Sequence, residues 1–379
     1  MSDQIIACTR CILDTKDDSN LQFDEQGICN HCRSYEELAK KYDLSKEAKE
    51  KILNQMFDNI KHAGKGKKYD CIFGVSGGVD STYLAYKLKE AGLRPLLVHF
   101  DNGWNSELAV KNIENILTKL NFDLYTYVVD WNEFRDLQLS YFKAGVLDLE
   151  VPTDHGFIAM LYKIAKKEGI KYIISGHNIV TEAILPKSMI WSKMDLMNLR
   201  GIHKKFGKQK LKTFPQIPYN RFLYYQITKK FDWVYPLNFM DYDKQAAKKL
   251  IIEKLNWKDY GGKHYESIFT RFYQAYILPR KFKIDKRKAH LSTLICSGQL
   301  TRNEALSEMK KEIFPADKLM EDKEYVIKKL GLTADEFEEI MNLPVKQHTD
   351  YPSYLTKHYK YEAILSKKLK PFTKLFKRK

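Results

Sequence analysis

The stretch that most constrains this chain is residues 69–88, YDCIFGVSGGVDSTYLAYKL. An apolar run at residues 71–75 predicts a buried strand, residues 76–81 predict a tight loop, and Thr82 begins a predicted helix. Glycines let backbone N–H groups approach an anion closely, and a helix N-terminus adds a partial positive charge. Strand, glycine loop and helix in this order predict a phosphate-binding site, with a plain turn between strand and helix as the alternative.

Polar side chains in the loop extend this prediction. Ser76 and Ser81 supply hydroxyl donors, whereas Asp80 suits a magnesium ion that bridges phosphates better than it suits a bare phosphate. No Gly-Lys-Ser/Thr follows, so the loop is not of the Walker type. The predicted cofactor-binding residues of the loop are Ser76, Gly77, Gly78, Val79, Asp80 and Ser81, and the predicted catalytic residues among them are Ser76, Asp80 and Ser81.

The length of the chain leaves room for more than this unit. Its 379 residues, 44% hydrophobic and 30% charged, allow one large α/β domain with smaller appendages. No apolar run reaches the roughly 18 residues that a membrane-spanning helix needs. The opening MSDQIIACTRC lacks the long apolar core of a signal peptide. We therefore expect a cytoplasmic protein with no transmembrane segment.

The formal net charge of +16 predicts an anionic partner such as a nucleotide, an acidic sugar, RNA or a membrane surface. Residues 357–379 contain nine Lys or Arg and one acid, Glu362, so half of the net charge lies in a terminal tail. This distribution weakens the case for RNA, and nucleic acid is not a favoured partner. Apolar residues among the tail's lysines could rest on an anionic membrane, but Pro371 interrupts them and favours a solvated or partner-docked tail.

Two Cys-x-x-Cys pairs stand near the N-terminus, Cys8 with Cys11 and Cys29 with Cys32. Four thiolates at this spacing predict a tetrahedral zinc site. The site would have a folding role, because residues 1–34 are too few to bury a core of their own. An iron–sulfur cluster and redox disulfides are the alternatives.

Strands and helices alternate after the first loop. Further strands are predicted at residues 96–100, 124–129 and 171–175, and a helix with one apolar face at residues 107–120. This alternation predicts an α/β fold with a doubly wound parallel sheet, in which ligands bind at the carboxyl ends of the strands.

The loop motif resembles the SGGxDS signature of the PP-loop ATP pyrophosphatase superfamily, whose members cleave ATP to AMP and pyrophosphate. In that superfamily the end of the second strand meets the adenosine, and a GHN-like segment borders the ATP site. The resemblance implies nucleotide contacts from His99, Phe100, Asp101, Gly176, His177 and Asn178. Ordinary capping of a strand end is the alternative for residues 99–101.

The resemblance also divides the chain into four segments. They are a four-cysteine zinc-binding module at residues 1–34, a helical linker at 35–68, a PP-loop ATP-binding domain at 69–256, and a mainly helical region for substrate or partner binding, with the basic tail, at 257–379. In the last segment, Thr301 and Thr333 each precede a glutamate by three residues, which predicts the N-caps of two helices.

Substrate contacts are expected from Asp154 and from residues 257–274. Residues 257–274, WKDYGGKHYESIFTRFYQ, combine aromatic rings, which pack on sugar C–H groups, with cations that suit a sugar acid. The predicted substrate residues are Asp154, Lys263, His264, Glu266 and Arg271. The alternatives are an N-cap role for Asp154 and a solvated surface helix for the others.

The whole arrangement resembles the N-acetyl sugar amidotransferase family, which works in bacterial surface-polysaccharide, lipopolysaccharide and nonulosonic acid biosynthesis. The C-terminal sequences YGGKHYESIFTRFYQ and RKAHLSTLICSGQLTRNEAL carry the specific part of this resemblance. It implies that the substrate is an N-acetylated sugar whose acetamido group becomes an acetamidino group. The amide oxygen would attack ATP to give an adenylated imidate and pyrophosphate, and ammonia would then displace AMP.

Ammonia requires a source. A glutaminase needs a cysteine nucleophile, either at the mature N-terminus or in a nucleophile elbow. Position 2 is a serine, Cys71 lies in the first predicted strand, and Cys296 does not lie in an elbow-like sequence. We therefore expect a separate glutaminase subunit, which the resemblance suggests is of the histidine-biosynthesis type with a barrel companion. The main alternative is a tRNA-modifying PP-loop enzyme that thiolates RNA with Cys296 as sulfur carrier, and a zinc-ribbon adaptor with a nucleotide sensor is a third reading.

Overall fold

In the computed structural model, which describes residues 5–262 and 265–356, five short parallel strands form one sheet in the order β3-β2-β1-β4-β5. The strands are β1 (Cys71–Gly74), β2 (Pro95–Asp101), β3 (Asp123–Val128), β4 (Tyr172–Ile174) and β5 (Asp232–Val234). Strand β1 is central, with β2 and β4 paired on its two sides. The strand order changes direction beside β1, which is where ligands bind in sheets of this kind. The predicted doubly wound parallel sheet is confirmed.

Alternating side chains of the strands pack into two separate hydrophobic cores. Ile72, Val98 and Ile173 point into one buried cluster, whereas Phe73, Leu97 and Ile174 point into another on the opposite face. This follows from the period of two in a strand. Because both faces are covered, the strands read as continuous apolar runs.

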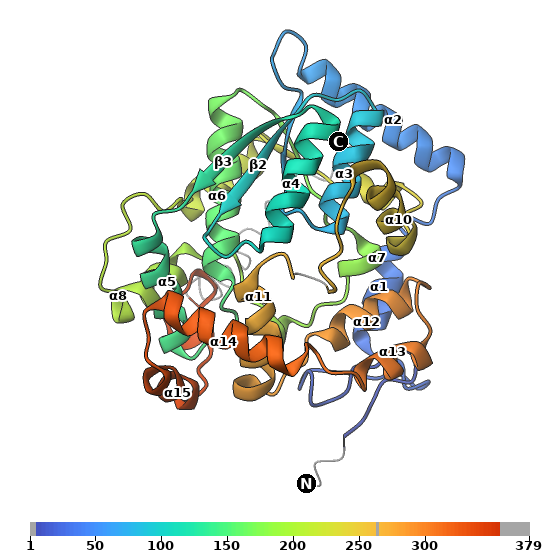
Figure 1. Ribbon diagram of the computed structural model, residues 1–379. Coiled ribbons are helices and arrows are strands. Elements are labelled where there is room, and N and C mark those ends of the chain that lie inside the picture. Colours follow the sequence, from blue (N-terminus) through green and yellow to red (C-terminus); the bar gives the residue numbers. More distant parts are fainter. Residues whose placement is uncertain (1–4, 263–264, 357–379) are drawn as a thin grey trace, which may run out of the picture.

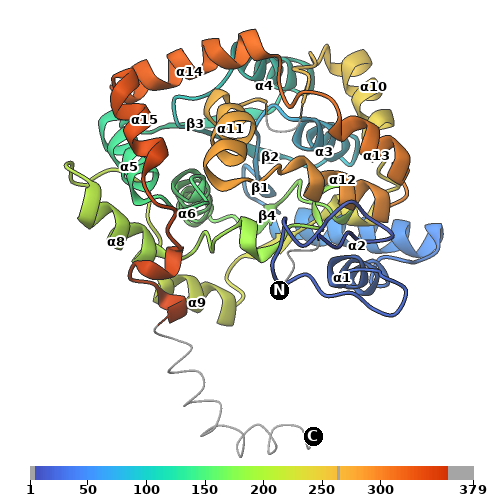
Figure 2. The same cartoon turned by 90° about the horizontal axis from the view of Figure 1, so that it is seen from below.

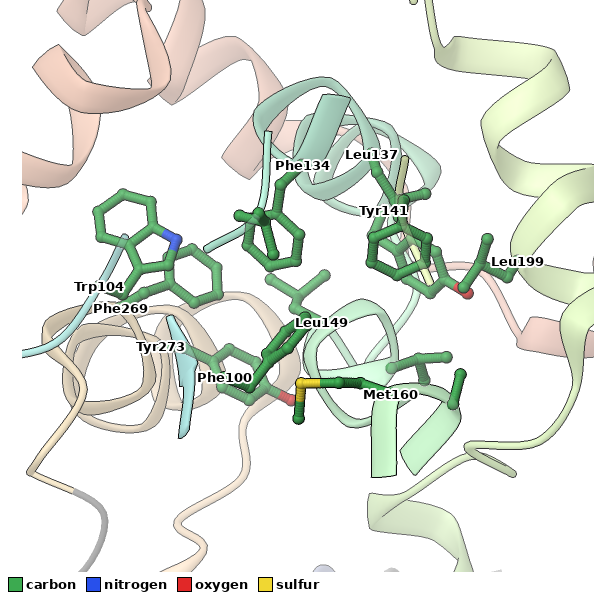
Figure 3. Packing of buried hydrophobic residues seen from close by; sticks show 14 of the residues in the cluster. Phe100, Trp104, Phe134, Leu137, Tyr141, Leu149, Met160, Leu199, Phe269 and Tyr273 are labelled. Carbon is green, nitrogen blue, oxygen red and sulfur yellow. The ribbon is translucent and has the colours of Figure 1, made fainter. Parts of the chain in front are cut away.

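Helices cover the two faces of the sheet (Figures 1 and 2). One core takes side chains from α2 (Lys46–Ala63), α3 (Val79–Glu90), α4 (Glu107–Leu120) and α10 (Lys244–Leu255). The other takes side chains from α5 (Trp131–Ala144), α6 (Val151–Lys167) and α8 (Leu196–Phe206). Figure 3 shows part of the second core, where Phe134 and Leu137 of α5 face Met160 of α6 and Phe100 of β2.

The remaining elements connect these layers or follow them. Before the sheet lies α1 (Asn30–Ala39), and between β4 and β5 lie α7 (Ile179–Glu182), η1 (Lys187–Met189) and α9 (Tyr219–Ile227). After β5 come η2 (Pro236–Phe239), α11 (Ile268–Phe272), the π-helical η3 (Tyr273–Phe282), α12 (Arg287–Cys296), α13 (Arg302–Met309), α14 (Ala316–Leu330), α15 (Ala334–Asn342) and η4 (His348–Asp350). Figure 1 shows α11, α12, α13 and α14 below the sheet.

Local sequence accounts for three helix boundaries. Two separate helices precede the sheet, because the chain leaves α1 after Ala39 and Ser45 starts α2 as an N-cap that accepts from Ala48 N. Helix α3 begins at Val79 rather than at the predicted Thr82, with Gly78 as N-cap. Helix α6 begins at Val151, and its proline occupies the first turn, where no hydrogen bond is lost.

Other local predictions were correct. Thr301 and Thr333 both form capping boxes, with Glu304 and Glu336 bonded back to them. Among the described residues, no helix has the length and apolar character needed to cross a bilayer.

Candidate active site

A cavity of about 920 Å³ lies between the carboxyl edge of the sheet and the C-terminal helices. One wall comes from the loop after β1 and from the end of β4, and the opposite wall comes from α12, α13 and the loops beside them. The sheet-side residues of the lining are Ser76, Gly78, Val79, Asp80, Ser81, Gly176, His177, Thr181 and Glu182. The C-terminal lining includes Trp257, Tyr260, Glu266, Gln274, Asp285, Lys286, Arg287, His290, Asn303 and Lys311.

Backbone geometry forms the loop at residues 76–81. Gly77 has φ +78°, and a Cβ on it would lie 2.7 Å from the carbonyl oxygen of Ala109 in α4. A side chain at this position would therefore be strained both by its backbone conformation and by the contact. On the other side, Trp257 Nε1 donates to the carbonyl oxygen of Gly77 at 2.8 Å. The loop is held between α4 and the C-terminal region.

Hydroxyl groups lie where the sequence predicts them. Ser76 Oγ and Ser81 Oγ are 3.4 Å apart. Ser76 Oγ also accepts from Gly78 N at 3.2 Å, and Ser81 Oγ donates to the Gly78 carbonyl oxygen at 3.1 Å. The two serines therefore form one polar surface at the start of α3, where the helix dipole favours an anion.

Asp80 occupies the first turn of α3 and faces the cavity. Its carboxylate accepts a short hydrogen bond from the Tyr242 hydroxyl, and Thr181 Oγ1 lies 3.5 Å away. Burial, followed by the charge of Asp80, raises the pKa of Tyr242 well above its usual range. Tyr242 therefore remains a neutral donor that orients the carboxylate, and an oxygen donor at this place suits Mg²⁺.

Two C-terminal side chains reach the same loop. A Cβ built on Gly78 would lie 3.2 Å from the Tyr260 hydroxyl oxygen and 3.5 Å from Glu266 Oε1. Burial, followed by the negative charge of Glu266, raises the pKa of Tyr260 above its usual range. The predicted substrate residue Glu266 thus lies at the loop of residues 76–81, and it links the C-terminal region to the predicted nucleotide site.

The residues at the end of β4 divide between lining and support. Gly176 and His177 line the cavity, and His177 Nδ1 pairs with Glu182 Oε2 at 2.5 Å. Asn178 is fully buried and caps α7, with its side-chain oxygen accepting from Thr181 N at 3.0 Å. Asn178 therefore supports the loop that carries His177.

The end of β2 is not part of this cavity lining. His99 Nδ1 lies 3.2 Å from the Val75 carbonyl oxygen, and its Nε2 lies 3.0 Å from Asn105 Nδ2. Phe100 is buried and stacks on Tyr127 with ring centres 5.9 Å apart. Asp101 accepts from Gly103 N at 2.9 Å and so also closes the turn after β2.

Asp154 lies in the first turn of α6 rather than at its N-cap, because the helix begins at Val151. It pairs with Lys193 at 3.0 Å, and Lys193 also binds Asp148 at 2.7 Å. The Lys193 charge lowers the pKa of the Asp148 carboxyl group despite its burial. Asp154 does not line the cavity, although Lys286 of the cavity wall feels the charges of Asp148 and Asp154.

The remaining predicted substrate residues are placed in different ways. Arg271 makes two hydrogen bonds of 2.7 Å to Asp322 and lies over the Phe314 ring at 4.6 Å, so its guanidinium is engaged in α11–α14 packing. It is absent from the cavity lining. Lys263 and His264 lie outside the described residues.

Most cations at the far end of the cavity have an acidic partner. Arg287 pairs with Asp285 at 2.7 Å, and Lys311 pairs with Glu308 at 2.6 Å. By contrast, Lys286 has no carboxylate of the described residues within 4.0 Å of its ammonium nitrogen. Burial lowers its pKa, and this desolvation favours pairing with an anion.

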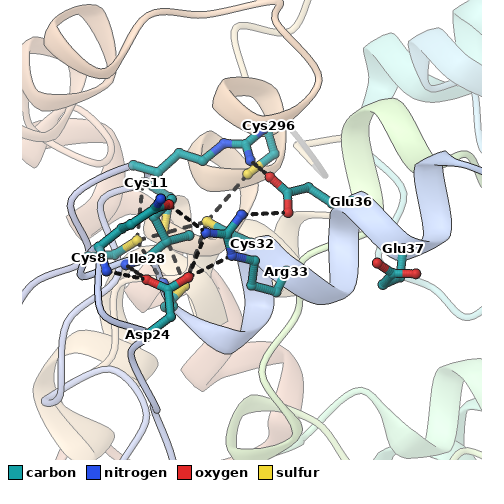
Figure 4. Close-up of polar contacts among 12 residues, drawn as sticks. Cys8, Cys11, Asp24, Ile28, Cys32, Arg33, Glu36, Glu37 and Cys296 are labelled. Carbon is teal, nitrogen blue, oxygen red and sulfur yellow. Dashed lines mark hydrogen bonds and ion pairs between the residues drawn. The ribbon is translucent and has the colours of Figure 1, made fainter.

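The four predicted metal ligands converge. Cys8, Cys11, Cys29 and Cys32 are buried, and their sulfur atoms all lie within 4.8 Å of one another. The Sγ–Sγ distances of 3.7 Å for the pairs Cys11–Cys29 and Cys29–Cys32, and of 3.9 Å for Cys8–Cys32, fit a tetrahedron with metal–sulfur bonds of about 2.3 Å. The site could hold a metal ion. Figure 4 shows the cluster with Arg33, which binds Asp24 and Glu36 beside it.

A fifth cysteine touches this cluster. Cys296 Sγ, at the end of α12, lies 3.5 Å from Cys32 Sγ (Figure 4). On the same helix, Ser292 Oγ accepts from Ile12 N at 3.4 Å, and Lys288 pairs with Asp14 at 2.6 Å. The helix that contributes to the cavity wall is therefore attached to the N-terminal module. Cys296 is absent from the cavity lining.

Several cavity residues were missed by sequence reasoning. Trp257 and Tyr260 belong to a segment that the sequence marked as a sugar site, but they approach the phosphate loop. Tyr242, which binds Asp80, carries no local motif, and a long-range hydrogen bond of this kind leaves no spacing signal in the sequence. Lys286 precedes the RKAHLSTLIC sequence, and only the fold brings it into the cavity wall.

The C-terminal part of the chain is similar to a known protein family. Residues 266–365 match the family described as "LPS biosynthesis protein WbpG-like, C-terminal domain". A tRNA(Ile)-lysidine synthase from Chlamydia pneumoniae is 37% identical over 76 residues, which are 19% of this chain and 23% of that protein. This chain therefore spans less than a quarter of the length of that relative.

Solved structures show a more distant likeness. An NMN synthetase from Francisella tularensis is 18% identical with a TM-score of 0.29, over 36% of this chain and 57% of that chain. An NH3-dependent NAD synthetase from Campylobacter jejuni is 15% identical with a TM-score of 0.31, over 55% and 93%. A predicted subunit of tRNA methyltransferase from Methanocaldococcus jannaschii is 14% identical with a TM-score of 0.27, over 48% and 74%.

The buried carboxyl group of Glu150 gives the protein a pH-dependent stability. Burial, followed by repulsion from Asp154, raises the pKa of Glu150 to about 8, against about 4.3 for an unfolded glutamate. Between these values the folded state keeps a proton that the unfolded state has lost, so the free energy of unfolding falls as pH rises. We expect Glu150→Gln to unfold at a higher temperature than the parent at pH 8, with the difference shrinking toward pH 5.

Thermal unfolding across that pH range provides the measurement. Glu25→Gln, an exposed glutamate exchanged in the same way, serves as the control and should follow the parent at each pH. A stability difference for Glu150→Gln that stays constant from pH 5 to pH 8 would contradict the assignment.

The cysteine cluster should hold about one metal ion per chain. Elemental analysis of the purified protein checks the number and separates zinc from iron. Cys29→Ser should lose the metal and lower the unfolding temperature, because the module lacks a core large enough to fold without it. Cys71→Ser changes an equally buried thiol of β1 and should keep the metal. Retention of metal by Cys29→Ser would refute the site.

Proposed function

We propose that this chain is an ATP-dependent N-acetyl sugar amidotransferase. Its residues 266–365 match the WbpG-like C-terminal domain of LPS biosynthesis. The observation that carries the proposal is one cavity with two kinds of wall. The phosphate loop forms one wall, and residues of the matched region form the other. A nucleotide and a sugar bound to opposite walls would meet inside it.

The proposed reaction converts an acetamido group into an acetamidino group. The amide oxygen attacks the α-phosphorus of ATP, pyrophosphate leaves, and an adenylated imidate forms. Ammonia then adds to the imidate carbon, AMP leaves with the oxygen, and loss of a proton gives the amidine. No protein nucleophile is needed, so the chain contributes binding, orientation and charge stabilisation.

The loop residues take the nucleotide side in this proposal. Ser76, Gly77, Gly78, Val79 and Ser81 would bind the pyrophosphate part through hydroxyl and backbone N–H donors. Magnesium would neutralise phosphate charge, with Asp80 as its protein ligand.

Beside the loop, His177 borders the nucleotide, and Gly176 and Asn178 shape its segment. We retain Asp101, half-buried at the end of β2, as a nucleoside contact. Its neighbours His99 and Phe100 are buried and would help to hold Asp101 in position.

The acceptor side is proposed for the C-terminal wall. Glu266, which lies near Gly78, would orient the acetamido group or the incoming ammonia. Arg271 would act indirectly, because its ion pair with Asp322 fixes the segment that carries Glu266. Asp154 would act indirectly, because its ion pair with Lys193 contributes to the electrostatic environment of Lys286. Lys263 and His264 remain proposed sugar contacts.

Zinc is the proposed ion of the four-cysteine site, where it would brace the N-terminal module against α12. A separate glutaminase subunit with a barrel companion is the proposed source of ammonia. The sugar substrate, a bacterial surface-polysaccharide or nonulosonic acid precursor, is proposed from the family resemblance and the matched LPS biosynthesis domain.

A pyrophosphate-release assay with ATP, Mg²⁺ and ammonium salt tests the reaction. We expect release only with an acetamido sugar, and a product about one mass unit lighter because NH replaces O. Asp80→Asn should lower the rate by roughly 100-fold or more, since a metal ligand at charged phosphates is lost. Asp259→Asn, which changes another acid of the cavity wall that is paired with Lys248, is the matched control and should retain most activity.

Bulk tRNA is included in the same assay. Release of pyrophosphate with tRNA and not with any sugar would replace this proposal by an RNA-modifying enzyme on the same loop. Release of pyrophosphate with glutamine in the absence of ammonium salt would contradict the proposal of a separate glutaminase.

Lys286 provides the second test of the site, as the proposed anchor for an anionic group of the sugar substrate. A charge-assisted hydrogen bond contributes about 1.5–3 kcal/mol, so Lys286→Met should raise KM for the sugar roughly 10- to 100-fold. KM for ATP and kcat should change little, and Lys286→Arg should restore part of the affinity. Lys311→Met, a lysine of the same cavity paired with Glu308, should stay near the parent.

Initial rates with each substrate varied in turn separate the two KM values. A rise in KM for ATP instead of the sugar would move Lys286 to the nucleotide side, and equal effects of the Lys286 and Lys311 variants would refute a specific anchor.

A further inference from the structure

The positive charge of this protein is gathered in two segments. Residues 196–231, which we call the basic lobe, contain nine Lys or Arg and no Asp or Glu. Residues 357–379 contribute eight net positive charges. Together these segments exceed the net charge of +16 by one, so the rest of the chain is nearly neutral. A charge this localised points to a surface function rather than to general solubility.

The basic lobe presents its charges to solvent. It includes α8, α9 and the loop between them, inserted between β4 and β5. All nine cationic side chains are exposed, namely those of Arg200, Lys204, Lys205, Lys208, Lys210, Lys212, Arg221, Lys229 and Lys230. The segment itself contains no acid, although Asp136 and Glu133 of α5 accept hydrogen bonds from its backbone between α8 and α9.

The end of the described chain lies on the same lobe. Tyr354 stacks on Tyr219 of α9 with ring centres 4.8 Å apart, and Tyr351 contacts Phe206 of α8 with ring centres 6.0 Å apart. The described chain therefore ends against the basic lobe.

Apolar side chains accompany the cations. On α9, the side chains of Leu223, Tyr224 and Ile227 are 37%, 54% and 79% exposed. Their spacing places them on one face of the helix, and Lys229 and Lys230 follow directly. Exposed aliphatic groups give little to a nucleic acid, whose backbone and base edges are polar. An aliphatic and aromatic face flanked by lysines suits the boundary between headgroups and acyl chains of a bilayer.

The basic lobe is also separate from the reaction. Among the described residues, those that line the active-site cavity all lie outside residues 196–231. In Figure 2, α8 and α9 lie on one side of the molecule, and α10 and α13 lie on the other. Binding at the lobe would therefore leave the cavity open.

We propose that the basic lobe binds an anionic phospholipid surface, with Leu223, Tyr224 and Ile227 at the level of the headgroups. This binding is peripheral and reversible, because it depends on a shallow apolar face and on screened charges. It would hold the protein beside a membrane.

Co-sedimentation of the full chain with vesicles tests the proposal. We expect binding to phosphatidylcholine vesicles that contain about one third phosphatidylglycerol, none to phosphatidylcholine alone, and loss of binding at about 1 M salt. Replacing Lys229 and Lys230 together by Glu should weaken binding at least about tenfold. Ile227→Ser should weaken it a few-fold while leaving the salt dependence unchanged.

The matched control reverses two exposed lysines of α2, Lys46→Glu with Lys51→Glu, which should bind as the parent does. All variants should keep the unfolding temperature of the parent, which excludes misfolding. Equal losses in the two double variants, or binding that ignores the anionic lipid, would overturn the proposal. Binding to bulk tRNA through Lys229 and Lys230 without binding to vesicles would overturn it in favour of a nucleic acid.

Discussion

The turn at Gly77 is the constraint on which the site depends. Its positive φ lets the chain leave β1 and enter α3 within a few residues, and the missing side chain lets α4 pack directly on the loop. Trp257 then binds the Gly77 carbonyl oxygen from the C-terminal side. A single backbone position thus joins the sheet, a covering helix and the region that follows β5. Because the loop is held on two sides, Asp80 meets Tyr242 and the cavity in a fixed direction.

Helix α12 likewise connects two parts of the molecule, the cavity and the N-terminal module. Its N-terminal turns face the cavity, where Arg287 and His290 belong to the lining. Its C-terminal half lies on the N-terminal module through Ser292 and Cys296. The four-cysteine cluster is therefore placed to define the position of one cavity wall, although it lies outside that wall. A folding role for the cluster and an effect on substrate binding would have one common cause.

Sequence reasoning found the parts that local chemistry determines. The parallel sheet, the turn at residues 76–81 and the convergence of the four cysteines follow from periodicity, glycine and spacing. It failed where a side chain meets a partner far along the chain. Arg271 has the chemistry of a sugar ligand, but Asp322 engages it, and Lys286 joins the cavity only through the fold. Spacing within a motif specifies neighbours on one element, whereas these contacts depend on how separate elements pack.

The distribution of charge separates two tasks within one chain. In the cavity, Arg287, Lys248 and Lys311 each lie beside a carboxylate, whereas Lys286 has no carboxylate of the described residues within 4.0 Å. Such pairing costs desolvation but fixes direction, which is what a site needs to orient a substrate. On residues 196–231 no acid is present and the cations remain in water. Charge of that kind attracts a partner from a distance and imposes no geometry on it. The paired charges therefore suit chemistry, and the unpaired charges suit a broad anionic surface.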